Sequence, residues 1–157
     1  MLNNSHSLFH AVHQLSRQLT KQLNEALEPY GLYNAQWAVL YVLKENGALT
    51  QKELCEYLAV EAPPMTRTIQ RLMKQGYIDQ RTGIDKRKKF IHLTSKAEAD
   101  FPKWEKAVLE ANQVLITSIP KGSQDILHSI LSEWLMGIKQ QVKTIGEEAK
   151  LNEQQST

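Results

Sequence analysis

The sequence predicts a mainly helical protein of the α+β class, in which a helix-turn-helix is followed by a short β-hairpin. Three observations indicate this class. Apolar residues recur at helical spacing near both ends of the chain, a capping motif opens a pair of short helices, and strand-like segments follow Gly76. With 157 residues, the chain is long enough for one domain with a real core and too short for two ordinary domains.

The first part of the chain is predicted to form two helices. The apolar residues of the first helix recur at steps of four and three, which places them on one face: Leu8, Val12, Leu15, Leu19 and Leu23. Pro29 and Gly31 then interrupt the pattern. A second helical pattern begins near Trp37 and ends at Asn46-Gly47, because glycine is a favoured residue after a helix.

A helix-turn-helix is predicted in the middle of the chain. Thr50 can accept a hydrogen bond from the amide of Glu53, whose carboxylate can reach back to the amide of Thr50, and this capping box marks a helix start. A break at residues 60–62 precedes a second helix, which begins at Pro63-Pro64 because proline fits a first helical turn. The residues expected to face the core from this second helix are Met65, Ile69 and Leu72.

Strands are expected after this pair of helices. Residues 77–81 and 88–93 read as strands, and the turn-rich residues 82–87 lie between them, which is typical of a β-hairpin. Thr94 can cap a further helix that ends at Pro120, and a last long helix follows it.

Positive charge is concentrated in the same part of the chain. Residues 50–96 hold ten Lys and Arg against five Asp and Glu, a local net charge of +5, whereas the whole chain carries +2. Such clustering is typical of a surface that faces phosphates, so double-stranded DNA is the expected partner.

The second helix of the predicted helix-turn-helix presents a polar face suited to DNA. Arg and Gln side chains can form paired hydrogen bonds with base edges, and an α-helix fits the major groove. The residues expected to project from this helix are Pro64, Thr66, Arg67, Gln70, Arg71 and Lys74. At the start of the preceding helix, Gln51 and Lys52 lie where backbone amides and a lysine can hold a phosphate.

The turn of the hairpin carries a second basic group. Arg87, with Lys86 and Lys88 beside it, lies on a loop narrow enough to enter a minor groove. Asp85 would be repelled by phosphate, so we expect it to act within the protein, accepting a hydrogen bond from Arg87 or a backbone amide and fixing the turn. Arg81 is an alternative partner for this carboxylate.

The segments GALTQKEL, APPMTRTIQRLMKQGYIDQR and DKRKKFIHLT resemble, in this order, the winged-helix core of the MarR family of bacterial transcription regulators. The resemblance covers nearly the whole chain, as one MarR-like unit over residues 1–157 with the DNA-binding core at 48–97. It implies that Pro63, Pro64, Thr66, Arg67, Gln70 and Arg71 belong to the recognition helix, and that Asp85 and Arg87 match the Asp-x-Arg of the wing. Lys86 stands where many members carry Arg, and Ala97 replaces a glycine often seen in the family.

The terminal helices are expected to form a homodimer. Their apolar residues exceed what so small a core can bury, so Leu8, Val12 and Leu15 could pack with Ile130, Trp134, Ile138 and Val142 in an intermolecular bundle. The resemblance implies such a dimer, formed by residues 1–30 and 100–149. Two recognition helices would then lie one DNA turn apart, roughly 34 Å, on a pseudo-palindromic operator.

The resemblance also implies regulation of transcription, more often repression, that a small molecule relieves. Family members often bind aromatic or phenolic molecules between the dimer helices and the winged domain. Tyr30, Tyr33 and Trp37 lie near that region in this chain, although aromatic residues at such spacing usually belong to a core.

Two possible sensing groups are weighed against simpler interpretations. Cys55, the only cysteine, lies near Glu53 and Glu56, which disfavour the thiolate, so an inert thiol is expected rather than a redox sensor. The three histidines at positions 6, 10 and 13 share a helix face, where polar surface is expected rather than a metal site. No metal and no cofactor is therefore expected.

Other classes of function are less favoured. The chain has no Gly-rich phosphate loop, nucleophile elbow or HExxH helix, so no enzyme is predicted. No apolar run approaches the ~20 residues of a membrane span, and a lone cysteine fits a reducing cytoplasm. Two alternatives stay open: a winged helix that binds an acidic protein partner, and a ligand- or metal-sensing module with little DNA sequence specificity.

Overall fold

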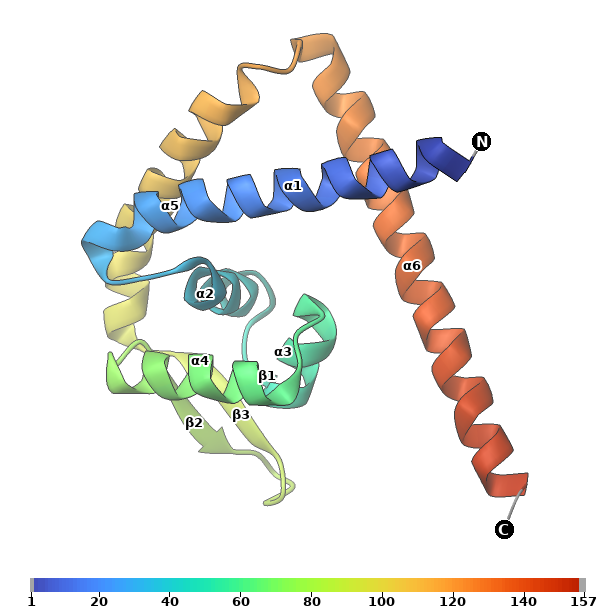
Figure 1. The fold of residues 1–157 in the computed structure, drawn as a ribbon. Coiled ribbons are helices and arrows are strands. Elements are labelled where there is room, and N and C mark those ends of the chain that lie inside the picture. The colour runs from blue at the N-terminus through green and yellow to red at the C-terminus, as the bar shows by residue number, and fades with distance from the viewer. Residues whose placement is uncertain (1, 156–157) are drawn as a thin grey trace. The chain divides into compact units, whose positions relative to one another are not determined.

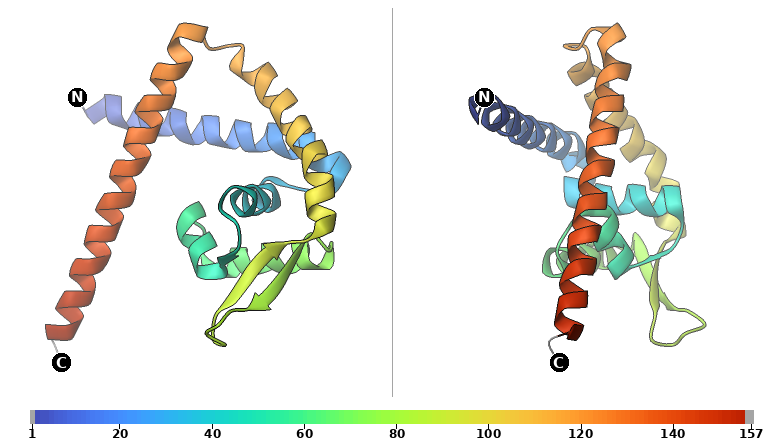
Figure 2. Two further views of the ribbon diagram at one scale, coloured as in Figure 1. Left: turned by 180° about the vertical axis from the view of Figure 1, so that it is seen from behind. Right: turned by 90° about the vertical axis from the view of Figure 1, so that its right-hand side faces the viewer.

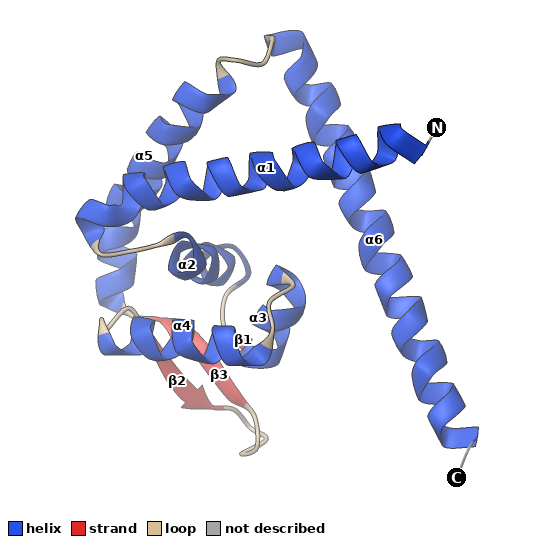
Figure 3. Ribbon diagram, viewed as in Figure 1, coloured by secondary structure: helices blue, strands red, loops and turns tan. Residues whose placement is uncertain are grey.

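The computed structural model describes residues 2–155, with side-chain surroundings for residues 4–147. Helices predominate over a small sheet (Figure 3). In chain order the elements are α1 (Leu2–Leu27), the 3₁₀ helix η1 (Glu28–Tyr30), α2 (Asn34–Asn46), β1 (Leu49–Thr50), α3 (Gln51–Leu58), α4 (Ala62–Lys74), β2 (Ile78–Thr82), β3 (Lys89–Leu93), α5 (Ser95–Ile116) and α6 (Lys121–Gln155) (Figure 1). They divide into two units, residues 1–112 and residues 113–157.

The turn between α1 and α2 depends on a glycine. Gly31 has a φ of 67°, in the left-handed region that favours a residue without Cβ. Asn24 of α1 accepts a hydrogen bond from the amide of Asn34 at 2.7 Å, so α1 supplies a cap for the first turn of α2. As a result, α2 lies between α1 and α4 (Figures 1 and 2).

The predicted helix-turn-helix consists of α3 and α4. Thr50 Oγ1 accepts from the amide of Glu53 at 3.3 Å, and Glu53 Oε2 accepts from the amide of Thr50 at 2.7 Å, which confirms the capping box. The second helix begins at Ala62, one residue earlier than predicted, because the extended backbone ends at Glu61, which is the N-cap residue. Both prolines still lie in the first turn, where a missing N–H is tolerated.

The sheet contains the predicted hairpin and one additional strand. β2 and β3 pair in antiparallel fashion, with Ile78 opposite Leu93. β1 pairs with the other edge of β3, with Leu49 opposite Ile91, so the strand order is β1-β3-β2. The sequence did not predict β1, because two residues are too few to show an alternating pattern.

The remaining helices begin and end close to their predicted boundaries. Thr94 caps α5, since its Oγ1 accepts from the amide of Ala97 at 3.2 Å and donates to the carbonyl of Gly76 at 2.7 Å. In the second unit, α6 follows Pro120 and carries many exposed apolar side chains. None of the described helices has an apolar stretch long enough to cross a bilayer.

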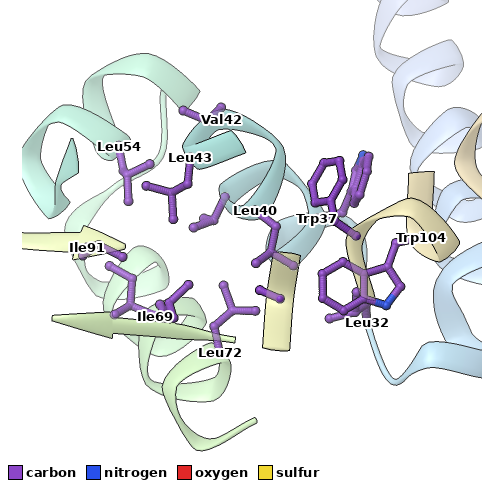
Figure 4. Close-up of a cluster of buried hydrophobic side chains, with 14 of the residues drawn as sticks. Leu32, Trp37, Leu40, Val42, Leu43, Leu54, Ile69, Leu72, Ile91 and Trp104 are labelled. Atoms are coloured by element: carbon purple, nitrogen blue, oxygen red, sulfur yellow. The ribbon is translucent and has the colours of Figure 1, made fainter. Parts of the chain in front are cut away.

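The core of the first unit joins helices α1 to α5 and the three strands (Figure 4). Trp37 of α2 stacks on Phe101 of α5 with ring centroids 5.2 Å apart, and Tyr77 meets the edge of Trp104 at 4.7 Å. The largest fully buried side chains are Leu27, Leu32, Val39, Leu40, Leu54, Met65, Leu72, Ile91 and Trp104. The predicted class, mainly helical with a helix-turn-helix and a hairpin, is confirmed.

The capping box of α3 gives a testable stability effect. Replacing an N-cap threonine by alanine typically costs about 1 kcal/mol, so Thr50→Ala is expected to lower the free energy of unfolding by that amount in urea titrations. Hydrogen bonds from the amide and hydroxyl of Thr50 hold the pKa of Glu53 below its ordinary value. The associated stability is therefore present at neutral pH and is lost as the pH falls through the lowered pKa.

The difference between the wild-type chain and Thr50→Ala should consequently shrink as the pH falls through the lowered pKa of Glu53. Thr144→Ala is the matched control, because Thr144 lies inside α6 and its substitution removes no cap. An equal loss of stability in both variants, or a difference that does not change with pH, would contradict this role of the capping box.

Candidate nucleic-acid interface

The face of α4 that points away from the core is polar and basic. Met65, Ile69 and Leu72 are buried, as predicted, and Ile69 and Leu72 point toward the other core side chains in Figure 4. Because these three side chains fix the rotation of the helix, the opposite face must be solvent-exposed. The exposed residues of this helix include Pro63, Pro64, Arg67, Gln70, Arg71 and Lys74.

The basic side chains of this face are not neutralised within the protein. Arg67, Arg71 and Lys74 form no ion pair with any residue in the part of the chain that the structure describes. Their hydrogen-bond donors therefore remain available to a partner, which is the arrangement that binding to base edges and phosphates requires.

A polar contact joins the starts of α3 and α4. Gln51 Nε2 donates to Thr66 Oγ1 at 2.7 Å, and the same hydroxyl donates to the carbonyl of Ala62 at 2.9 Å. The amide of Gln51, which the sequence placed toward phosphate, thus binds the neighbouring helix. Lys52 is different, since its side chain is 84% exposed and its only ion pair among the described residues is a 3.9 Å contact with Glu56.

Asp85 organises the turn between β2 and β3. Its Oδ1 accepts from the amide of Arg87 at 3.1 Å and from Arg87 Nε at 3.3 Å. Both predicted partners of this carboxylate are therefore present, while the Arg87 side chain remains 92% exposed. Lys86, next to it, is exposed as well.

The alternative pairing of Asp85 with Arg81 is wrong. Arg81 binds Asp79 instead, through Nε to Oδ1 at 3.1 Å and Nη2 to Oδ2 at 3.0 Å. The reason is local, because Asp79 and Arg81 are two apart on β2 and project to the same face, whereas Asp85 lies beyond the end of that strand, in the turn.

The hairpin of β2 and β3, residues 78–93, is called the wing below. The wing and the start of α3 line a common hollow of ≈ 630 Å³. Its basic lining residues are Lys52, Arg87, Lys88 and Lys89. Glu53 and Glu56 also line this hollow; the carboxylate of Glu53 is held by Thr50, and that of Glu56 lies 3.9 Å from Lys52 Nζ. The positive charge of Lys88 adds to the hydrogen bonds from Thr50 in lowering the pKa of Glu53. The sequence placed these cations on separate elements, and the fold brings them to one surface.

The three aromatic residues considered for ligand binding do not share one site. Trp37 is buried against Phe101 and belongs to the core. Tyr33 is exposed and lines a small pocket of ≈ 240 Å³ together with Arg67 and Arg71 of α4. Tyr30 lies at the end of η1 and is not among the residues that line this pocket.

The same pocket is lined by two residues that the sequence had not singled out, Gln36 and Thr68. Gln36 lies directly before Trp37, where the predicted apolar pattern of α2 begins, and is buried. Because it lies outside that pattern, no sequence signal marked this position.

Cys55 does not have the surroundings of a reactive thiol. It packs against the core, and burial is the largest cause that raises its pKa, followed by the negative charges of Glu61 and Glu56. The sequence prediction named Glu53 and Glu56 as the acids that disfavour the thiolate. In the structure Glu61 has this effect together with Glu56, while the carboxylate of Glu53 binds Thr50. A raised pKa reduces the thiolate fraction at neutral pH.

The three histidines of α1 are exposed. Within the residues that the structure describes, no three His, Cys, Asp or Glu side chains lie close enough to share a metal ion.

Comparison with known proteins places this geometry in a family. The model of the MarR family matches residues 30–88. The HTH-type transcriptional regulator YwoH of Bacillus subtilis is 45% identical over 109 residues, covering 69% of this chain and 80% of the relative. An HTH-type transcriptional regulator of Bacillus cereus is 35% identical over 86 residues, and this match spans 55% of the chain and 57% of that relative.

A solved structure has the same fold along most of its length. A cysteine-to-serine mutant of MarR from E. coli, crystallised with operator DNA, aligns with a TM-score of 0.78 and 25% identity. The alignment covers 86% of this chain and 98% of the E. coli chain. The chain belongs to the MarR family of helix-turn-helix transcriptional regulators.

Proposed function

We propose that the protein is a repressor that binds a pseudo-palindromic operator in the cytoplasm as a homodimer, through a DNA-binding core at residues 48–97. The observation that carries this proposal is the unpaired basic face of α4, which lies on the same unit as the exposed Arg87 of the wing. The likeness to a MarR chain crystallised with operator DNA supports it. The local net charge of +5 in residues 50–96 would attract any polyanion, so sequence specificity must come from the contacts of single side chains with bases.

In this proposal α4 lies in the major groove. Arg67, Gln70 and Arg71 read base edges, because guanidinium and amide groups can form paired hydrogen bonds with guanine and adenine. Pro63, Pro64 and Thr66 approach the DNA closely at the start of the helix. Thr66 offers mainly its methyl group, since its hydroxyl already binds Gln51 and Ala62.

Phosphate contacts come from the edges of the same surface. Lys52, Lys74 and Lys86 neutralise phosphates, and Gln51 contributes by holding α4 against α3. Arg87 enters the minor groove, where negative potential is concentrated, and Asp85 orients its guanidinium.

The dimer is proposed to form through residues 1–30 and 100–149. Exposed apolar side chains support this assignment, because soluble monomers rarely expose contiguous apolar faces. On α1 they include Leu8, Leu15 and Leu19, and on α6 they include Ile126, Ile130, Leu131, Leu135, Ile138, Val142 and Ile145.

We further propose that a small aromatic molecule releases the repressor. The pocket beside Tyr33 supports this, because an aromatic ring can pack on the tyrosine while an acidic substituent pairs with Arg67 or Arg71. Such a ligand would engage the arginines proposed to read DNA, so its binding and operator binding would compete.

Arg71→Ala tests base reading by α4. The variant is expected to lose about 1–3 kcal/mol of discrimination between the preferred duplex and duplexes changed at a single base pair. Competition binding by fluorescence anisotropy measures this difference. Lys74→Ala is the control, since loss of a phosphate contact should weaken all duplexes alike and reduce the salt dependence.

If Arg71→Ala retains wild-type discrimination, α4 does not read DNA as proposed. If scrambled duplexes compete with the preferred sequence equally well in the wild-type chain, the basic surface serves an acidic partner rather than a specific operator.

Asp85→Ala tests whether Asp85 acts by orienting Arg87 or only through its negative charge. Removing a negative charge beside the wing should tighten DNA binding if charge alone matters, whereas loss of the contacts to Arg87 should weaken it. We expect an affinity loss of roughly threefold to tenfold, and a similar or larger loss for Arg87→Ala. Electrophoretic mobility shifts at fixed salt measure both.

Asp79→Ala is the matched control, because it removes an equal charge from the same hairpin and breaks the pairing with Arg81 only. Tighter binding by both aspartate variants would contradict the positioning role of Asp85.

The dimer is tested by sedimentation equilibrium at micromolar concentration. The wild-type chain should sediment as a dimer, and Ile138→Glu should shift it toward the monomer because a charge would be buried in the interface. Gln140→Glu, at an exposed polar position on the opposite side of the same helix, should leave the dimer intact. A monomeric wild-type chain would reject this assembly.

A further inference from the structure

A buried amide lies where α2 meets the end of α4. Gln36 is 2% exposed, the one buried polar residue among the described residues. Its Oε1 accepts from the amide of Tyr33 at 3.0 Å, and its Nε2 donates to Gln75 Oε1 at 2.8 Å. Both ends of the side chain are therefore satisfied, as a buried polar group requires.

The second glutamine, Gln75, links Gln36 to the turn between α1 and α2. Gln75, which directly follows α4, uses its Nε2 to donate to the carbonyl of Gly31 at 2.9 Å. We call the three linked groups, the side chains of Gln36 and Gln75 and the carbonyl of Gly31, the amide relay.

Contacts at either side of the relay extend it to other helices. Asn24 of α1 accepts from the amide of Asn34, close to the same turn. Lys96 Nζ donates to the carbonyl of Gln75 at 2.7 Å and lies 4.6 Å from the centroid of the Tyr77 ring. The end of α4 is thus held from the α1–α2 turn on one side and from α5 on the other.

These hydrogen bonds fix the position of the end of α4 more exactly than apolar packing can. The buried face of α4 fixes which residues point outward, but apolar contacts are non-directional and tolerate small rotations and slides of a helix. Hydrogen bonds depend steeply on distance and angle, so a chain of satisfied amides defines one position of the helix end.

We infer that the amide relay positions the recognition helix α4 relative to α1 and thereby sets the half-site spacing that the protein prefers. This inference rests on the proposed function, in which α1 takes part in the dimer and α4 reads DNA. Gln36 and Gln75 are positioning residues in this scheme, because neither needs to touch DNA.

The test compares the full-length wild-type chain with Gln75→Met, Gln36→Met and the double variant. Methionine keeps the length of the side chain and removes its hydrogen bonds. The probes are duplexes that the wild-type chain selects from a random pool, rebuilt with single-base-pair insertions or deletions between their half-sites. Two quantities are measured: affinity as a function of spacing at one salt concentration, and the salt dependence of affinity at the preferred spacing.

Each glutamine variant should lose about tenfold in affinity at the preferred spacing and change little at the others, so that the spacing profile flattens. The double variant should lose no more than the worse single variant, because the relay acts as a unit. The salt dependence should stay that of the wild type, since no phosphate contact is removed.

Two controls distinguish positioning from general damage. Ile91→Val removes packing from the core without touching the relay, and Gln113→Met removes an exposed amide from α5. Both should keep the wild-type spacing profile.

The inference is overturned if Gln75→Met keeps the wild-type profile, or if its loss is equal at all spacings and matches that of Ile91→Val. Those results would leave the proposed function intact, because the wild-type chain would still show a preferred sequence and spacing. A wild-type chain with no sequence preference would instead overturn both the proposed function and this inference.

Discussion

The burial of one face of α4 is the constraint on which the rest of the structure depends. Met65, Ile69 and Leu72 enter the core, and each such side chain contributes about 1.5–3 kcal/mol relative to exposure. A rotation of the helix that exposed them would therefore cost far more than any surface contact could return. Arg67, Gln70, Arg71 and Lys74 point outward as a consequence, so the same packing that stabilises the core also presents the basic face.

Directional contacts refine this arrangement at the two ends of α4 and in the β2–β3 turn. Gln51 binds the start of α4, Gln75 binds near its end, and Asp85 binds Arg87 at the wing. Each contact uses a side chain that is polar but makes no proposed contact with a base. These hydrogen bonds hold the elements that carry the basic side chains in fixed positions, so the basic surface has a defined shape as well as a charge.

Much of this could be predicted from the sequence, because the determining interactions are local. The capping box of Thr50 and Glu53, the inward face of α4 and the contact of Asp85 with Arg87 all join residues within a few positions of one another. The contacts that were not predicted join residues far apart in the sequence. Gln36 and Gln75 are 39 positions apart, and the two-residue strand β1 exists only through its pairing with β3. Trp37 shows the remaining difficulty, because an aromatic residue in a helix reads the same whether it faces a ligand or a core.

Sequence-specific DNA binding by α4 is the central claim of this account, and selection of duplexes from a random pool by the wild-type chain tests it most directly. We expect enrichment of one motif in two inverted copies, with centres separated by one helical turn, roughly 10 base pairs. Two recognition helices related by a two-fold axis require that symmetry. A bound pool without an enriched motif, retained by charge alone and lost steeply with salt, would contradict the claim.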